Sequence, residues 1–171
     1  MQRLLSIAIA FFAVLTVSGQ NVSNNSFESW HTSGSLLIPD SFRTGDQVMS
    51  MPSPGVSRSN EAHSGQFAVA IQNVYLSPGV GMSGQIHYGS LNNSGGYFHF
   101  YNWPYNQRPI SMKFWYKFAR NGSDTAQASI TLTRWNNGQR ETVGQGVMNI
   151  FTTVSSYTQA EIQVSYLSSA Q

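Results

Sequence analysis

One aromatic segment, residues 97–108, carries the side chains best suited to contacting a ligand. It alternates tyrosine, phenylalanine and tryptophan rings with asparagine and glutamine amides, and it ends on an arginine. Sugars present apolar C–H faces that stack on rings, and hydroxyl groups that need amide or guanidinium partners. Pro104 and Pro109 stiffen the segment, which lowers the ordering cost of binding. The segment therefore indicates a carbohydrate contact surface.

Strand alternation and the loop that follows define the expected contact set. If the two phenylalanines of the segment point inward, Tyr101 faces outward, and Trp103 and Tyr105 follow in the loop. We expect the main contacts from Tyr101, Trp103, Tyr105 and Arg108, with Asn102, Asn106 and Gln107 as polar assistants. The alternative is that these rings cap the open end of a hydrophobic core.

Trp115 is a second candidate contact. It shares the otherwise polar face of an alternating segment with Lys113 and Lys117. A tryptophan on the outer face of a sheet can serve as a platform for a sugar ring. The alternative is that a long loop covers it.

The acidic and histidine residues argue against catalysis. A glycosidase needs two carboxylates flanking one bond, and alternation places no two of the seven acidic residues on one obvious cleft. The four histidines lack metal-binding spacing, and the chain has no nucleophile elbow. We therefore expect a non-catalytic protein, with a glycan hydrolase or lyase as the less favoured alternative.

The amino-acid composition excludes further classes of protein. Cysteine is absent, which rules out thiol catalysis, thiolate metal sites and a disulfide framework. Charged residues make up 9% of the chain, the net charge is +2, and the basic residues are scattered. No basic stripe is present that would follow a nucleic-acid backbone, so no nucleic-acid partner is expected.

The elements that must position these residues have a period of two, which is typical of half-buried antiparallel strands. The expected strands are Phe67–Ile71, Met112–Phe118, Ala126–Leu132 and Ile162–Tyr166, with weaker ones at Val80–Leu91 and Val143–Phe151 because of their glycines. Turn signals separate them, and Asn137-Gly138 predicts a hairpin. With about eight strands expected, the pattern indicates an all-β, two-sheet jelly roll.

The N-terminus predicts export. Arg3 precedes the apolar run 4–17, and Ser18-Gly19 provides small residues for cleavage, which is the layout of a signal peptide. We assign residues 1–19 to the signal peptide and residues 20–171 to one β-sandwich domain. The domain is expected to be secreted, at the outer surface or extracellular, with no transmembrane segment after cleavage.

Several motifs carry a family resemblance. They are the segments 25–30, 61–69 and 107–118, followed by Gly122-Ser123-Asp124-Thr125-Ala126. Together they resemble the bacterial carbohydrate metabolism domain of Bacteroidetes type, a jelly roll similar to carbohydrate-binding modules. The resemblance implies a galactose-binding-like β-sandwich that is extracellular, non-catalytic and often holds a structural calcium ion.

The resemblance also implies a calcium ligand and a difference at the C-terminus. Glu28, with the Ser64-Gly65 turn, resembles the structural calcium site, although Glu28 could instead pair with a nearby arginine or amide. The closing strand of the family is not found before Gln171. We therefore expect a domain truncated at its C-terminus, with an exposed sheet edge that favours a protein partner.

Two functions remain open at this point. The first is a carbohydrate-binding domain that needs no cofactor and binds a polysaccharide or glycan through the aromatic loop. The second is a structural or adhesive surface module that binds protein partners.

Overall fold

The computed structural model describes residues 22–48, 52–77, 80–94, 97–102 and 104–167, and these residues form an all-β, antiparallel structure. The predicted signal peptide lies outside the described residues. The strands are β1 (Trp30–Ser33), β2 (Leu36–Pro39), β3 (Phe42–Thr44), β4 (Val56–Ser59), β5 (Ala68–Ile71), β6 (Val74–Ser77), β7 (Val80–Met82), β8 (Ile86–Tyr88), β9 (Ser90–Ser94), β10 (Tyr97–Tyr101), β11 (Ser111–Phe118), β12 (Ala126–Asn136), β13 (Gln139–Ile150), β14 (Val154–Gln163) and β15 (Ser165–Tyr166). The one helical element among the described residues is a short 3-10 turn, η1 (Gly45–Gln47). The predicted all-β class is confirmed.

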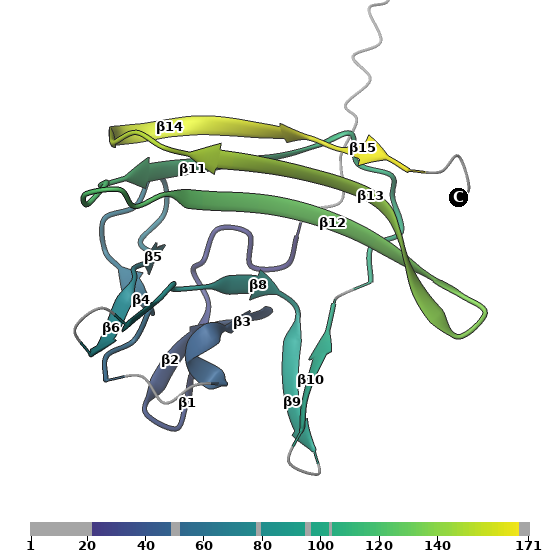
Figure 1. Cartoon of the computed structure of the whole chain (residues 1–171), viewed down its shortest axis with the longest axis horizontal. Helices are drawn as coiled ribbons and strands as arrows, with labels where there is room; N and C mark the ends of the chain where they lie inside the picture. Colours follow the sequence, from purple (N-terminus) through teal and green to yellow (C-terminus); the bar gives the residue numbers. More distant parts are fainter. Residues whose placement is uncertain (1–21, 49–51, 78–79, 95–96, 103, 168–171) are drawn as a thin grey trace, which may run out of the picture.

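The four long strands form the upper layer in Figure 1. β11 pairs with β14, and β12 pairs with β13 through a hairpin whose central residues, Asn137 and Gly138, both have positive φ, as the Asn-Gly signal predicts. After β14 the chain crosses to β13: Val164 donates a backbone hydrogen bond to Ile110 at 2.9 Å, and Leu167 then donates one to Val143 at 2.9 Å. The β11–β14 pair and the β12–β13 hairpin therefore meet at the corner between β14 and β15.

A glycine of β13 allows this corner to form. A Cβ on Gly146 would lie 2.3 Å from the backbone oxygen of Gln163, which is closer than any real contact. The glycines that weaken the strand signal of residues 143–151 thus permit close approach of two backbones.

Short paired strands lie beneath the long ones (Figure 1). They pair as β1–β2, β3–β8, β4–β5, β6–β7 and β9–β10. The weakly predicted strand at residues 80–91 is divided among β7, β8 and the start of β9. These breaks let β8 pair with the distant β3.

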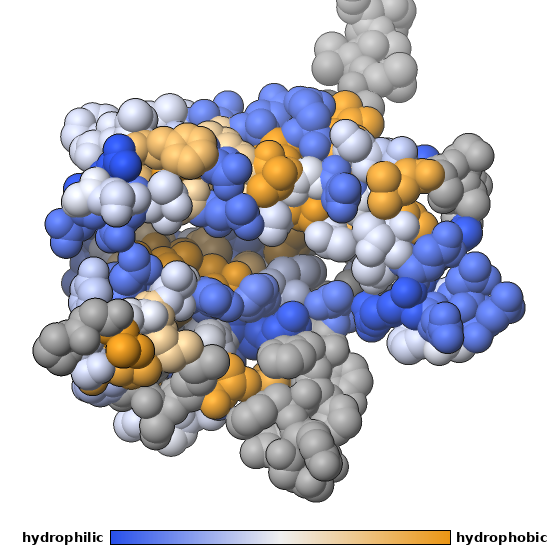
Figure 2. All heavy atoms as spheres, viewed as in Figure 1, coloured by the Kyte–Doolittle hydropathy of each residue, from blue (hydrophilic) through white to orange (hydrophobic). Residues whose placement is uncertain are grey.

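The hydrophobic core lies between the two sets of strands, where Figure 2 shows apolar atoms deep in a recess. The buried apolar residues are Ile38, Val56 and Val74 from the short strands and Ile150, Ala160 and Ile162 from the long ones. Inward-facing residues of β11 and β12, such as Phe114 and Ile130, are half-buried. In the part of the chain that the structure describes, no helix has the length and apolar character needed to cross a bilayer.

The buried carboxylate of Asp46 fixes the position of η1. Its two oxygens accept hydrogen bonds from the backbone N–H groups of Gly55 and Val56, each at 2.9 Å. Hydrogen bonds to a buried carboxylate compensate its loss of water. They tie η1 to the start of β4 and so position the residues on either side of η1.

Candidate functional site

Trp115 lies on the outer face of β11 with 46% of its surface exposed. The His63 imidazole stacks on the indole with ring centroids 3.9 Å apart and planes within 10°. The imidazole covers part of one face of the indole, and nearly half of the residue still remains exposed. The ring is therefore both exposed and held in one orientation.

The segment 60–67 brings His63 to this position and is anchored on β11 and β14. Glu61 forms a salt bridge with Lys117, and its backbone oxygen accepts a hydrogen bond from the Tyr157 hydroxyl at 2.7 Å. The Tyr157 ring also meets His63 edge to face at 5.7 Å. Contacts on both strands thus hold the imidazole against Trp115.

Glu28 holds the other end of the same segment. Its Oε1 accepts hydrogen bonds from the backbone N–H groups of Gln66 at 2.9 Å and Phe67 at 3.2 Å. The chain reaches Glu28 through Gly65, whose φ is +74°. This arrangement corresponds to the alternative in which Glu28 pairs with nearby polar groups.

Polar side chains border the exposed indole across the β11–β14 pair. Gln159 is the direct register partner of Trp115, and Lys113 pairs with Glu161 at 3.6 Å on the same face. The Ser111 hydroxyl, followed by weaker contributions that include Lys113, lowers the pKa of the Glu161 carboxyl. An amide, an ammonium and a carboxylate thus lie on the same face as the ring and could bind the hydroxyl groups of a sugar lying on it. We call this surface, formed by Trp115, His63, Lys113, Gln159 and Glu161, the Trp115 platform.

The structure describes the predicted aromatic loop only in part. Trp103 lies outside the described residues, and Tyr101 ends β10 with its side chain undescribed. Tyr105 is half-buried. Arg108 is exposed, and its guanidinium lies 3.9 Å from the centroid of the Tyr166 ring. The amide residues of the predicted set, Asn102, Asn106 and Gln107, are exposed.

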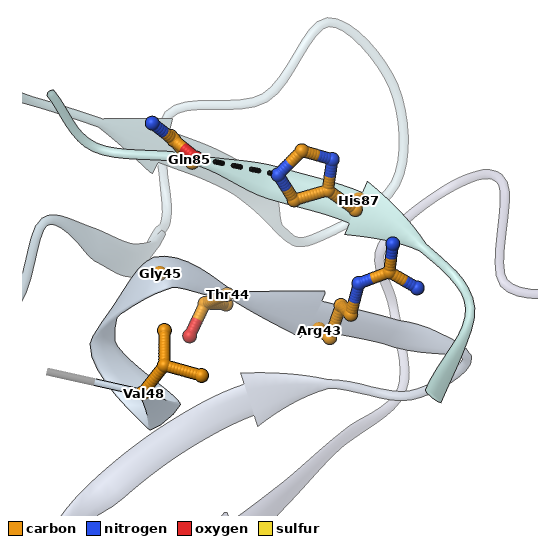
Figure 3. A pocket seen from close by; sticks show the side chains of 6 residues that line it. All are labelled: Arg43, Thr44, Gly45, Val48, Gln85 and His87. Carbon is orange, nitrogen blue, oxygen red and sulfur yellow. Dashed lines mark hydrogen bonds between the residues drawn. The ribbon is translucent and has the colours of Figure 1, made fainter. Parts of the chain in front are cut away.

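One described contact joins this loop to a pocket. The side-chain oxygen of Asn102 accepts a hydrogen bond from the Arg43 guanidinium at 3.4 Å. Arg43 lines a pocket of about 220 Å³ together with Thr44, Gly45, Val48, Gln85 and His87. Figure 3 shows the Arg43 side chain extending from β3 toward β8, which carries His87 and directly follows Gln85. The loop and the pocket are therefore neighbours.

Two basic residues face each other in this pocket. Arg43 of β3 and His87 of β8 are direct register partners. Burial lowers the pKa of Arg43, which remains charged at neutral pH. Burial, followed by the charge of Arg43, lowers the pKa of His87. Sequence reasoning missed this pair, because only the register between two non-consecutive strands brings the two residues together.

The positions of the carboxylates determine where a metal ion could bind. Among the described residues, no group of three or more histidine, cysteine, aspartate or glutamate side chains gathers in one place. A calcium ion takes about six to eight oxygen ligands, and Glu28 supplies one carboxylate that already binds two N–H groups. Calcium binding at Glu28 therefore stays a prediction. The other carboxylates with described partners are Asp40 with His31, Asp46 with Gly55 and Val56, Glu61 with Lys117, Glu141 with Arg134, and Glu161 with Lys113.

Comparison of the chain with protein-family models, with curated proteins and with solved structures gives no match. The family resemblance therefore rests on the sequence motifs alone.

Proposed function

We propose that this chain is a secreted, non-catalytic carbohydrate-binding domain whose paired sheets form a jelly-roll-like sandwich. The observation that carries the proposal is the exposed indole of Trp115, stacked on His63 and bordered by polar side chains. A sugar ring can place its C–H face on the indole while its hydroxyl groups meet Gln159, Lys113 and Glu161. Glycans are the partners that match such a surface.

The contacts of segment 60–67 support this use of Trp115. A ring that is already fixed loses little conformational freedom when a ligand binds. A stacking contact contributes about 0.5–1.5 kcal/mol beyond burial of the rings. One platform of this kind corresponds to modest affinity. The exposed amides of the loop at residues 102–107 provide a second place where the glycan could make contact.

Export and lack of catalysis belong to the same proposal. Residues 1–19 have the pattern of a signal peptide. Glu161, the carboxylate of the Trp115 platform, forms an ion pair with Lys113. The proposal therefore assigns binding to this surface and no bond-breaking step.

Affinity electrophoresis of the mature protein in gels containing single polysaccharides tests the proposal. The variant Trp115→Ala should lose about tenfold in affinity for any polysaccharide that retards the wild type. Trp135→Ala is the matched control, because Trp135 is also exposed, at 67%, but lies at the β12–β13 hairpin. Replacing both Trp103 and Tyr105 with alanine tests the loop in the same gels. If no polysaccharide retards the wild type, or if Trp115→Ala and Trp135→Ala behave alike, the proposed use of the platform is wrong.

A second function, binding of a protein partner, is favoured by the edge of the long-strand layer. β12 pairs on one side with β13, and within the described ranges no strand pairs with its other side. Large apolar side chains are also exposed, among them Ile110 at 77% and Leu167 at 60%. An unpaired edge and exposed apolar groups are features of adhesive surfaces. Concentration-dependent self-association without glycan binding would favour this function over the first.

A further inference from the structure

The pocket beside the aromatic loop has the chemistry of an anion site. Its lining residues carry one guanidinium, one imidazole, one hydroxyl and one amide, and they include no carboxylate. A guanidinium binds the two oxygens of a carboxylate or a sulfate with parallel hydrogen bonds. The register of β3 and β8 places Arg43 and His87 side by side, so both can reach one ligand (Figure 3).

The nearby carboxylate of η1 does not line the pocket. Both oxygens of Asp46 accept hydrogen bonds from the backbone of Gly55 and Val56. Among the lining residues, Arg43 carries a positive charge and none carries a negative one. A ligand that brings negative charge would be favoured over a neutral one of equal size.

The size and the surroundings of the pocket limit the kinds of ligand that it can bind. A volume of about 220 Å³ suits a single anionic group with part of one ring rather than a large cofactor. Asn102 binds Arg43 and so places the loop at residues 102–107 beside the pocket. A ring attached to the anion could then contact that loop.

We propose that this pocket binds the anionic substituent of an acidic sugar, either the carboxylate of a uronic acid or a sulfate ester. The claim that a glycan carries the anion rests on the proposed function. The claim that the pocket binds an anion does not depend on it. The Arg43 guanidinium provides the charge and orientation, and His87 completes the contacts.

NMR titration of the mature protein with glucuronate, inorganic sulfate and glucose tests the pocket itself. Glucuronate or sulfate should shift the ring resonances of His87, and glucose at the same concentration should not. The variant Arg43→Gln should weaken the response about tenfold, while Arg140→Gln, which removes the same charge from the β12–β13 hairpin, should leave it unchanged. His87→Gln is a further variant that keeps the test valid if Arg43→Gln fails to fold.

The inference is overturned if glucose gives the same shifts, or if Arg43→Gln and His87→Gln both bind glucuronate like the wild type. Gels containing polygalacturonate, a sulfated galactan or a neutral glucan then distinguish a carboxylate ligand from a sulfate ligand, and binding at the pocket from binding at the Trp115 platform. If Arg43→Gln is no longer retarded by the acidic gels but is still retarded by the neutral gel, the result supports anion binding at the pocket. Binding of free glucuronate without retention in any gel also supports the pocket, while it contradicts the proposed function at Trp115.

Discussion

Replacing Gly65 with alanine should loosen the segment that holds His63 against Trp115. A Cβ on Gly65 would lie 2.0 Å from Glu28 Oε1. The atom in the way is the end of a flexible side chain, so Glu28 can rotate away. When it does, the N–H groups of Gln66 and Phe67 lose their shared acceptor. The clash is therefore relieved at the expense of two hydrogen bonds.

The loss in the free energy of unfolding that we expect for Gly65→Ala has two parts. Alanine at a positive φ costs about 1–2 kcal/mol relative to glycine. Losing hydrogen bonds to a carboxylate in this partly exposed position adds about 1–2 kcal/mol. Gly34 has a φ of +62° and nothing within 4 Å of its Cβ position, so Gly34→Ala carries only the first part. We expect Gly65→Ala to lower the free energy of unfolding by about 1–2 kcal/mol more than Gly34→Ala does.

Urea unfolding of the two variants, alone and combined with Glu28→Ala, measures this difference. In the Glu28→Ala background the carboxylate is gone, so Gly65→Ala should cost no more than Gly34→Ala. The His63 ring resonances should move toward their unstacked positions in Gly65→Ala and stay in place in Gly34→Ala. Equal costs for both glycines with Glu28 present would refute the role assigned to this carboxylate.

Three further predictions concern the fold and its bound groups. Gly146→Ala should destabilise the domain more than Gly65→Ala, because its Cβ would meet the backbone oxygen of Gln163 at 2.3 Å, which cannot rotate away; thermal unfolding of the two variants compares them. Burial, followed by the charge of Arg43, lowers the pKa of His87 in the folded state below 6.5. The folded domain is therefore fully stable above pH 6.5, where His87 is neutral, and its free energy of unfolding falls as the pH drops toward the folded-state pKa. Urea midpoints at about pH 7.5 and about pH 5.5 should therefore differ less in His87→Gln than in the wild type, and equal differences would contradict this assignment. If Glu28 binds calcium, millimolar calcium should raise the melting temperature of the wild type and not that of Glu28→Gln, whereas equal responses would count against a site at Glu28.

The sequence predicted the long strands well, because alternation is a local signal. Residues 112–118 and 126–132 alternate strictly, and β11 and β12 include both ranges. The end of β12 was missed: it continues to Asn136, because pairing with β13 in the hairpin extends a strand beyond its own alternating pattern. The strand at 162–166 is instead split between β14 and β15 by the crossing to β13.

The candidate site was predictable only where it depends on one strand. Trp115 was found because a tryptophan among lysines on a polar strand face stands out in the sequence. Its partner His63 was not found, because the segment 60–67 reaches β11 through contacts of Glu61 and Glu28 that no local pattern encodes. The same reason explains why Arg43 was interpreted only as one of several scattered basic residues.

The interactions that fix the side chains differ between the Trp115 platform and the pocket at Arg43. This difference decides which measurement is informative for each site. The Trp115 ring is fixed by stacking and by the anchored segment around His63, so removing the ring removes a contact without rearranging the sheet. The pocket instead places Arg43 directly beside His87, and burial, followed by the charge of Arg43, lowers the pKa of His87. An anion bound beside both residues would offset the repulsion between them, so ligand binding there should stabilise the folded domain as well as occupy a site. A rise in unfolding temperature with glucuronate that disappears in Arg43→Gln and remains in Arg140→Gln would separate this pocket from any surface that merely attracts anions.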